Sequence, residues 1–345
     1  MSYIVTAATG QLGGNIVDSL LALNVDPSLI VATGRDSAKL ESLADKEVNT
    51  AVLDYTKPET VAAVVKPGDT LVLVSSDAVG QRFAQHSTVI AAAKEAGAAR
   101  IIYTSAPKAT TSALILAPEH KATEEFLAAS GVPNTILRNG WYTENYLPQV
   151  AQGGATGEIV GSAANGRVSS ASRKDYAEAA AAVALDDSYN GQIFELSGDF
   201  AWNFHELAAA IGEISGRQVS YRNLSQAEHF EYFTAAGLDE GTAGFLSALD
   251  TNIREGLLGE TSGGLSRLTG KPSVGAAPVR RHHVFAHRGG LAVFGDRHRS
   301  VQRGDHRLVD RRPHAHATGD RRVGHGRDHG RLDPVGAVFH SDRGA

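Results

Sequence analysis

The sequence of 345 residues contains no cysteine. Disulfide bonds, thiolate metal sites and cysteine nucleophiles are therefore excluded. It has no apolar run close to the roughly 18 residues that a transmembrane helix needs. Its first ten residues, MSYIVTAATG, show no basic segment ahead of an apolar one, which argues against a secretory signal. These absences predict a soluble cytoplasmic protein with no membrane partner.

Positive charge is scarce in most of the chain. Residues 1–274 hold 19 Lys and Arg against 31 Asp and Glu, whereas residues 275–345 hold 14 Arg against 7 Asp and ten of the 14 histidines. An acidic body argues against a nucleic-acid partner, because phosphate contacts require clustered cations. The last segment shows no helical or strand period and little apolar surface, so it is predicted to be disordered. Its composition resembles that of a GC-rich gene read out of frame, and its histidines lack a metal-ligand spacing, so no metal site is predicted.

Short apolar runs alternate with helical patterns along the first 150 residues. Strands are predicted at 3–6, 29–33, 50–53, 70–74, 100–104 and 134–137, and helices at 11–23, 37–44, after Pro58, at 79–96 and at 118–130. Strands separated by helices indicate right-handed crossovers and a parallel sheet. The fold class is therefore α/β, with a Rossmann-type doubly wound parallel sheet.

The pattern changes after residue 150. Helices are predicted at 173–185, 204–215 and 225–248, the last interrupted at Gly237, and strands at 192–196 and 219–221. The expected organisation is a dinucleotide-binding domain over 1–150, to which 151–200 partly returns. A smaller, mostly helical substrate-covering domain follows over 201–274, and then the segment 275–345.

A glycine-containing turn separates the first predicted strand from the first helix. The residues predicted there to bind a dinucleotide are Ala7, Thr9, Gly10, Gln11, Leu12 and Gly13. Small residues in a G-x-x-G-x-x-G turn let the backbone approach a pyrophosphate at a helix N-terminus. Ala7 replaces the first glycine of that pattern. A tight turn without a ligand is the alternative interpretation.

Residues at the ends of the next strands select the cofactor. Arg35 follows the second predicted strand, where a guanidinium suits a 2′-phosphate. This favours NADPH, while Asp36 beside it keeps NADH open. Asp54, past the third strand, is expected to contact the adenine. Ser75 and Ser76, past the fourth, are expected to line the middle of the cofactor.

No tyrosine of the nine is followed by a lysine four residues later. Short-chain dehydrogenases use such a pair to move a proton to or from a carbonyl group. Its absence argues against alcohol or ketone chemistry by that route. A quinone does not need the pair, because its electron-poor ring accepts a hydride and water can supply the second proton. Quinones are therefore compatible with the sequence, although this argument does not select them.

Several runs resemble NmrA-like atypical short-chain dehydrogenases, namely Thr9–Gly13, Val79–Arg82, Tyr103–Ser105 and Glu119-His120. The run Leu137–Tyr146, LRNGWYTENY, narrows the resemblance to the bacterial NAD(P)H:quinone oxidoreductase type 2 group. The resemblance covers about residues 3–274 and implies NADPH-dependent hydride transfer to a quinone. One alternative is an NmrA-like redox-sensing regulator that binds NADP(H) without turnover. Another is an isoflavone-reductase-like or sugar-nucleotide enzyme that uses a different acid, with Lys108 and Lys121 as the candidates for the former.

The resemblance also implies the residues of the site. Those implied near the cofactor are Arg138, Asn139, Gly140, Trp141, Tyr142, Thr143 and Arg173. Asn139, Trp141, Tyr142 and His120 are the candidates to line the quinone and nicotinamide site, with core packing as the alternative for the two aromatics. Arg138 has a salt bridge as its alternative role. His205 and His229 are interpreted as surface residues, and a homodimer is one open option for assembly.

Overall fold

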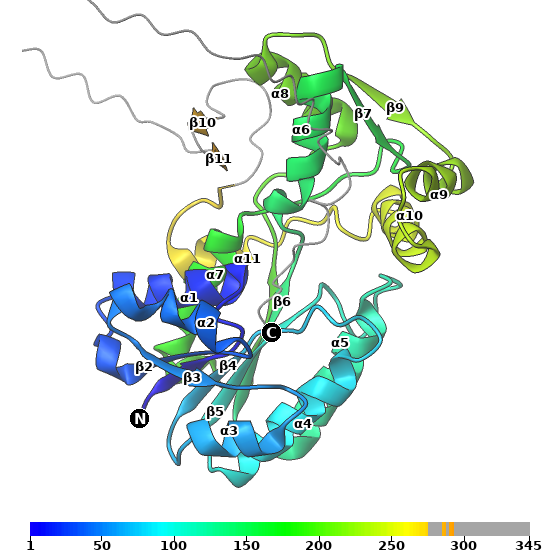
Figure 1. The fold of residues 1–345 in the computed structure, drawn as a ribbon. Helices are drawn as coiled ribbons and strands as arrows, with labels where there is room; N and C mark the ends of the chain where they lie inside the picture. Colours follow the sequence, from blue (N-terminus) through cyan, green and yellow to red (C-terminus); the bar gives the residue numbers. More distant parts are fainter. Residues whose placement is uncertain (275–284, 288–289, 293–345) are drawn as a thin grey trace, which may run out of the picture.

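The computed structural model describes residues 1–274, 285–287 and 290–292 (Figure 1). In the last segment it describes one antiparallel pair, β10 (Phe285–His287) and β11 (Gly290–Ala292). The predicted disorder and frameshifted origin of 275–345 otherwise lie outside the described residues.

A seven-stranded parallel sheet forms the larger part of the fold. Its strand order is β3-β2-β1-β4-β5-β6-β8, and every neighbouring pair is parallel. The strands are β1 (Tyr3–Val5), β2 (Ile30–Gly34), β3 (Asn49–Val52), β4 (Thr70–Leu73), β5 (Arg100–Ser105), β6 (Asn134–Asn139) and β8 (Ile193–Leu196). Every residue of β4 and β5 is buried, as expected for parallel strands covered on both faces. The predicted α/β, Rossmann-type class is confirmed.

Helices cover both faces of this sheet (Figure 1). On one face α1 packs against α7, and on the other α3, α4 and α5 lie side by side. The bounds are α1 (Gln11–Ala22), α2 (Ser37–Glu41), α3 (Pro58–Val64), α4 (Arg82–Glu95), α5 (Ala117–Ser130) and α7 (Arg173–Ala184), with 3-10 turns at Pro27–Leu29, Ala44–Lys46, Thr143–Tyr146 and Asp187–Tyr189. The helix predicted from residue 79 begins only at Arg82, because Gly80 has a φ of 85°, outside the helical range.

A second, smaller part builds its own core. Strands β7 (Glu158–Gly161) and β9 (Ser220–Asn223) pair in parallel beside helices α6 (Leu147–Thr156), α8 (Phe204–Ser215), α9 (Gln226–Ala235) and α10 (Glu240–Arg254). Buried Ile159, Phe204 and Ile253 belong to its apolar cluster, which is separate from the cluster of the large sheet. The chain then returns through α11 (Gly264–Thr269), which packs on α7.

Two differences from the predicted elements have local causes. The helix predicted over 225–248 is divided into α9 and α10 around Gly237, which has a φ of 95°. Helix α6 was not predicted, since Gly153 and Gly154 weaken its helical pattern. Tertiary packing overrides that preference, because a Cβ on Gly153 would lie 2.8 Å from the Ile159 side chain.

The order of the sheet reverses between β1 and β4, and a crevice at such a point is where parallel α/β sheets bind ligands. Thr6, which follows β1, ties the two strands together. Its hydroxyl donates to the Val72 carbonyl at 3.1 Å and accepts the Val74 amide at 2.9 Å. Gly13 in α1 packs directly on this end of β1, since a Cβ there would lie 2.3 Å from the Ala7 carbonyl oxygen.

We expect Gly13→Ala to lower the free energy of unfolding by about 1–3 kcal/mol, because α1 must move away from β1 to accept the methyl group. Gly154→Ala is the matched control, since no atom lies within 4 Å of its added Cβ. A helical alanine should raise the stability of that variant by about 0.5–1 kcal/mol. Urea denaturation of both variants measures the difference, and equal stability of the two would contradict this account.

Candidate active site

One cavity extends from the carboxyl edge of the large sheet to helices α9 and α10. At the sheet end it is lined by Ser75, Arg82, Ser105, His120, Asn139, Gly140, Trp141, Tyr142 and Arg173, and at the helical end by Tyr146, Gln149, His229, Phe233, Phe245, Leu249, Asp250 and Ile253. Its walls are mostly apolar, with a small number of polar groups at each end. A concave apolar site with a few convergent polar groups is typical of small-molecule binding.

The glycine-containing turn lies between β1 and α1, as predicted. Ala7 adopts a φ of 50°, the left-handed conformation that glycine takes without strain. The turn is held by the Ala8 amide, which donates to the Thr33 carbonyl at 2.7 Å, and by the Gly10 amide, which donates to Ala7 at 2.9 Å. The turn therefore keeps its shape even though Ala7 replaces the first glycine of the pattern. Thr9, Gln11 and Leu12 lie with Gly10 in this turn and the start of α1.

The candidates for the adenosine side lie at the ends of β2 and β3. Arg35 directly follows β2 and is exposed. The Asp36 carboxylate is engaged as the N-cap of α2, since it accepts the amides of Ala38 and Lys39 at 3.0 and 3.3 Å. Burial acts to raise the pKa of Asp54, but the Thr56 hydrogen bonds and the charges of Lys57 and Arg35 lower it overall. Asp54 is thus an anion in the electrostatic reach of Arg35.

Ser75 and Ser76 have different surroundings. Ser75 lines the cavity, and its amide donates to the Thr104 hydroxyl at 2.8 Å. Ser76 is buried, with its amide donating to His86 Nε2 at 3.0 Å and its hydroxyl to the Gln85 side chain at 2.5 Å. Of the two, only Ser75 lies in the cavity wall.

A chain of buried rings determines which nitrogen of His120 carries hydrogen. His86 accepts the Ser76 amide at Nε2, so a neutral His86 must carry its hydrogen on Nδ1, which faces Thr123 and Tyr103 at 3.1 and 3.3 Å. The Tyr103 hydroxyl lies 2.7 Å from His120 Nδ1, the shortest contact of this chain. With the hydroxyl donating to Nδ1, a neutral His120 carries its hydrogen on Nε2.

Burial keeps these three groups neutral. It lowers the pKa of His86 to about 3 and that of His120 well below its usual range, assisted in both by the positive charge of Arg82. Burial also raises the pKa of Tyr103 above its ordinary value. His120 is 4% exposed and lines the cavity, so it presents a neutral ring whose Nε2–H can donate a hydrogen bond.

The run after β6 forms the floor of the cavity. The Gly140 amide donates to the Leu196 carbonyl at 2.7 Å, and a Cβ on Gly140 would lie 2.8 Å from that oxygen. Asn139, Trp141 and Tyr142 line the cavity, whereas Thr143 is buried and bonds to the Ser170 hydroxyl at 2.9 Å. The Arg173 guanidinium lies 4.6 Å from the centre of the Tyr142 ring, within the range of a cation–π contact.

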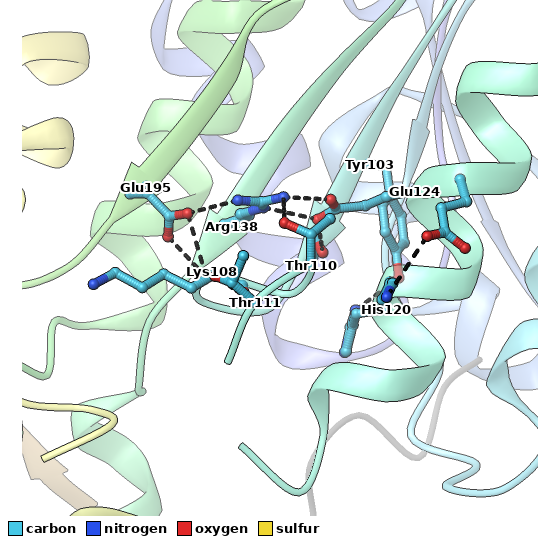
Figure 2. Close-up of polar contacts among 11 residues, drawn as sticks. Tyr103, Lys108, Thr110, Thr111, His120, Glu124, Arg138 and Glu195 are labelled. Atoms are coloured by element: carbon cyan, nitrogen blue, oxygen red, sulfur yellow. Dashed lines mark hydrogen bonds and ion pairs between the residues drawn. The ribbon is translucent and has the colours of Figure 1, made fainter. Parts of the chain in front are cut away.

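Arg138 lies in a buried ion-pair network between β6, α5 and β8 (Figure 2). Its Nη2 and Nε donate to Glu124 at 2.6 and 3.0 Å, and its Nη1 donates to Glu195 at 2.9 Å. Ser105 adds a hydrogen bond to Glu124 at 2.6 Å. The hydrogen bonds that Arg138 donates to Glu124 raise the pKa of Arg138 above its ordinary value, although burial opposes this shift. The alternative role of a salt bridge thus describes the surroundings of Arg138 in this structure, with one buried carboxylate partner, Glu124, and one partly exposed partner, Glu195.

Buried polar atoms without a hydrogen-bond partner gather around this cavity. Among the described residues, those that also line it are Arg82 Nη1, Asn139 Oδ1, Tyr146 Oη, Gln149 Oε1 and Arg173 Nε. An unsatisfied buried polar atom costs about 1–3 kcal/mol. A bound dinucleotide and a polar substrate would satisfy such atoms, so the residues fit a nicotinamide cofactor.

Four residues of the site were not found from sequence. Arg82, Gln149 and Asp250 were not candidates, and the interpretation of His229 as a surface residue was wrong, since it is 4% exposed. His229 packs against Phe233 with the ring centres 4.2 Å apart. The i, i+4 spacing of these rings on one helical face was the available signal. His205 is exposed, as predicted.

Within residues 1–274 and the two described strands beyond them, no three His, Asp or Glu side chains are grouped to hold a metal ion. The same part of the chain has no helix with the length and apolar character to cross a bilayer.

Comparison with known proteins shows a match to the NAD(P)H-binding family over residues 7–187. Quinone oxidoreductase 2 of Escherichia coli K12 is 42% identical over 278 residues, which are 81% of this chain and 97% of that protein. The NADPH complex of the NADPH-dependent quinone oxidoreductase of Escherichia coli superposes with a TM-score of 0.76, covering 79% of this chain and 96% of that one. The NADP(H) complex of Citrobacter triphenylmethane reductase is 33% identical, with a TM-score of 0.75 and the same coverage. The resemblance inferred from LRNGWYTENY is confirmed.

We expect Arg138→Met to lower the free energy of unfolding by about 3–5 kcal/mol, because the buried Glu124 carboxylate is left without its cation. The control is Arg167→Met, since Arg167 pairs with Glu206 at 2.9 Å on the exposed surface and such pairs contribute about 0–1 kcal/mol. Thermal and urea unfolding of both variants would test this expectation. A loss for Arg138→Met no larger than that of the control would refute the structural role.

Proposed function

Because this chain belongs to the NAD(P)H-binding family, we propose that it is an NADPH-dependent oxidoreductase whose electron acceptor is a quinone. The supporting observation is the cavity at the carboxyl edge of the sheet, with its apolar walls and its unpartnered polar atoms. A flat, uncharged ring suits such walls, and its carbonyl oxygens suit the donors at the sheet end. The similarity to the quinone oxidoreductase of Escherichia coli favours the same class of acceptor.

The chain offers a group for each part of the cofactor. The turn from Thr9 to Gly13 would hold the pyrophosphate at the N-terminus of α1, and Arg35 the 2′-phosphate. Asn139, Tyr142 and Arg173 would border the nicotinamide, with Asn139 Oδ1 and Arg173 Nε as buried atoms that still lack partners. NADPH, when bound, supplies the hydride. The Asp36 carboxylate caps helix α2, so its hydrogen-bonding capacity is used within the protein rather than for the ribose hydroxyl of NADH. This favours NADPH over NADH.

His120 is the group that we assign to the quinone oxygen. Its Nε2–H would donate a hydrogen bond to the carbonyl oxygen on which negative charge develops, as preorganised donors do in other active sites. The ring does not deliver a net proton, because the chain from His120 through Tyr103 and His86 ends at the Ser76 amide. The remaining proton of the hydroquinone therefore comes from water. This assignment explains how the site operates without a Tyr-x-x-x-Lys pair.

The first experiment measures the loss of NADPH absorbance with simple benzoquinones and naphthoquinones, with NADH in parallel. We expect quinone-dependent oxidation that prefers NADPH. Arg35→Ala should reduce the NADPH/NADH ratio of kcat/KM by about 10- to 100-fold, the size of one lost charge-assisted hydrogen bond. The exposed Arg222→Ala variant, which loses only a surface pair with Glu158, should keep the ratio.

Tight NADPH binding without oxidation in the presence of any quinone would contradict the proposed enzyme. That outcome would instead favour the redox-sensing regulator, which binds the cofactor and does not consume it.

We expect His120→Phe to lower kcat/KM for a quinone by about 100-fold or more, the typical effect of removing one oxyanion donor. His120→Gln keeps an N–H donor and should retain more activity. Tyr103→Phe removes the bond that fixes the tautomer and should give an intermediate loss. Because burial holds the pKa of His120 well below its usual range, kcat/KM should not fall from protonation of this ring between about pH 8 and pH 6. A decline centred near the ordinary histidine pKa would rule out the buried, neutral donor.

A further inference from the structure

A second polar cluster lies in the same cavity, at the end away from the sheet. Asp250 on α10 accepts the Ser162 amide at 2.6 Å, and its carboxylate lies 3.3 Å from His229 Nδ1. The Ser162 hydroxyl lies 3.0 Å from that same nitrogen. Asp250 and His229 both line the cavity and are 8% and 4% exposed. The three groups come from α10, α9 and the segment after β7, so the small part of the fold assembles this cluster by itself.

The hydrogen bonds within the cluster leave it with acceptors. Burial lowers the pKa of His229 to about 4, so its ring is neutral at physiological pH. The Ser162 hydroxyl contributes a hydrogen bond to Asp250. With its hydrogen directed to that carboxylate, its oxygen accepts from His229 Nδ1–H, which leaves His229 Nε2 as an acceptor. The Asp250 carboxylate is an acceptor in its ionised form.

The cluster also carries negative charge at neutral pH. Burial raises the pKa of Asp250 to about 6, although hydrogen bonds from Ser162 oppose the shift. The titratable groups around it are His229 from α9, Tyr146, Tyr221 from β9 and Arg254 from its own helix. Both tyrosines stay protonated because burial raises their pKa values, and Arg254 is exposed. Within the described residues no Lys or Arg forms an ion pair with Asp250, so above about pH 6 the Asp250–His229 pair carries a net charge of about −1.

Two further buried polar atoms, the Tyr146 hydroxyl and Gln149 Oε1, belong to residues that line the same cavity. Tyr146 is 5% exposed, its hydroxyl is buried, and it senses the charge of Asp250. Burial and the charge of Asp250 raise the pKa of this hydroxyl, and a hydrogen-bonding contact with the Trp141 side chain opposes that shift. Gln149 Oε1 is a buried acceptor without a donor. A purely structural role for Asp250 does not explain why these atoms are left without partners. An asparagine at position 250 could accept the Ser162 amide equally well, so that hydrogen bond does not require a carboxylate.

We propose that Asp250 and His229 form a second subsite, which binds a hydrogen-bond-donating substituent, an amine or a hydroxyl, on the ring of the electron acceptor. This inference rests on the proposed quinone reductase function and specifies which acceptors the site selects. The cavity is then polarised, with donors and cations at the sheet end, including His120, Arg82 and Arg173, and acceptors at the helical end. An acceptor that fits presents its carbonyl oxygen to the sheet end and its donor group to Asp250.

The test compares naphthoquinones that carry an aminoalkyl, a hydroxyalkyl or a plain alkyl chain of equal length, using the full chain with saturating NADPH. At about pH 7.5 we expect the aminoalkyl compound to exceed the alkyl compound by about tenfold or more in kcat/KM, with the difference in KM. Asp250→Asn should reduce this ratio to near one. Asp239→Asn is the matched control. This substitution makes the same chemical change at the exposed N-cap of α10 and should leave the ratio unaltered. Below about pH 6 the advantage of the amine should decline in the unchanged protein, because the carboxylate becomes protonated.

Equal use of the amine, hydroxyl and alkyl acceptors by the unchanged protein would overturn the subsite, as would a ratio that survives Asp250→Asn. If Asp250→Asn does not fold, His229→Gln provides the second variant and should also reduce the ratio. A binding measurement separates this inference from the quinone reductase proposal. Quenching of Trp141 fluorescence by phenylbutylamine, compared with the methyl ether of phenylbutanol, reports the subsite without turnover. Tighter binding of the amine that Asp250→Asn abolishes supports the subsite even if no quinone is reduced, and equal binding of the two probes counts against it.

Discussion

The carboxyl edge of the large sheet is governed by the need to give every buried polar group a partner. Strands β4, β5 and β6 are almost entirely buried, yet polar residues lie at their ends or, for β4, just beyond its end. Thr104 accepts the Ser75 amide, and Ser105 donates to Glu124. Glu124 in turn requires Arg138, and Arg138 reaches across to Glu195 on β8. This network fixes the strand ends and α5 relative to one another, and with them the ring of His120, which lies on the same helix.

The cavity is the place where that need is left unmet. Most buried polar atoms nearby are paired, so the unpartnered atoms of Asn139, Arg82 and Arg173 mark where ligand atoms are expected. His120 differs from them because its Nδ1 is already occupied by Tyr103. The site therefore contains one donor whose orientation is set in advance and several atoms that gain partners only with a ligand. A donor that is oriented in advance favours turnover, whereas atoms that gain partners only from the ligand contribute to binding.

Local sequence signals were sufficient for the sheet and for locating the residues at its carboxyl edge. The turn at Gly10 and Gly13, the arginine after β2 and the run from Asn139 to Tyr142 each follow a strand directly, so chain position alone indicates where they lie. Arg138 shows the limit of that reasoning. Successive residues of a strand point to opposite faces, and so Arg138 meets Glu124 while Asn139 lines the cavity. The helical end could not be predicted because Asp250 and His229 meet only when α9 packs on α10, and no short motif encodes that contact.

The β1–α1 turn and the helical end of the cavity consequently depend on different cores. Ala7, Ala8 and Leu12 of the turn and of α1 belong to the cluster of the large sheet, whereas Ile253 and Leu249, which flank Asp250, belong to the cluster of the small part. Changes at sites with no shared partners tend to add in free energy. Under the proposed function, substitutions on α9 and α10 would therefore alter which acceptors bind without disturbing the turn that holds the cofactor. The division of the fold into two cores would then also separate the binding of the cofactor from the selection of the acceptor.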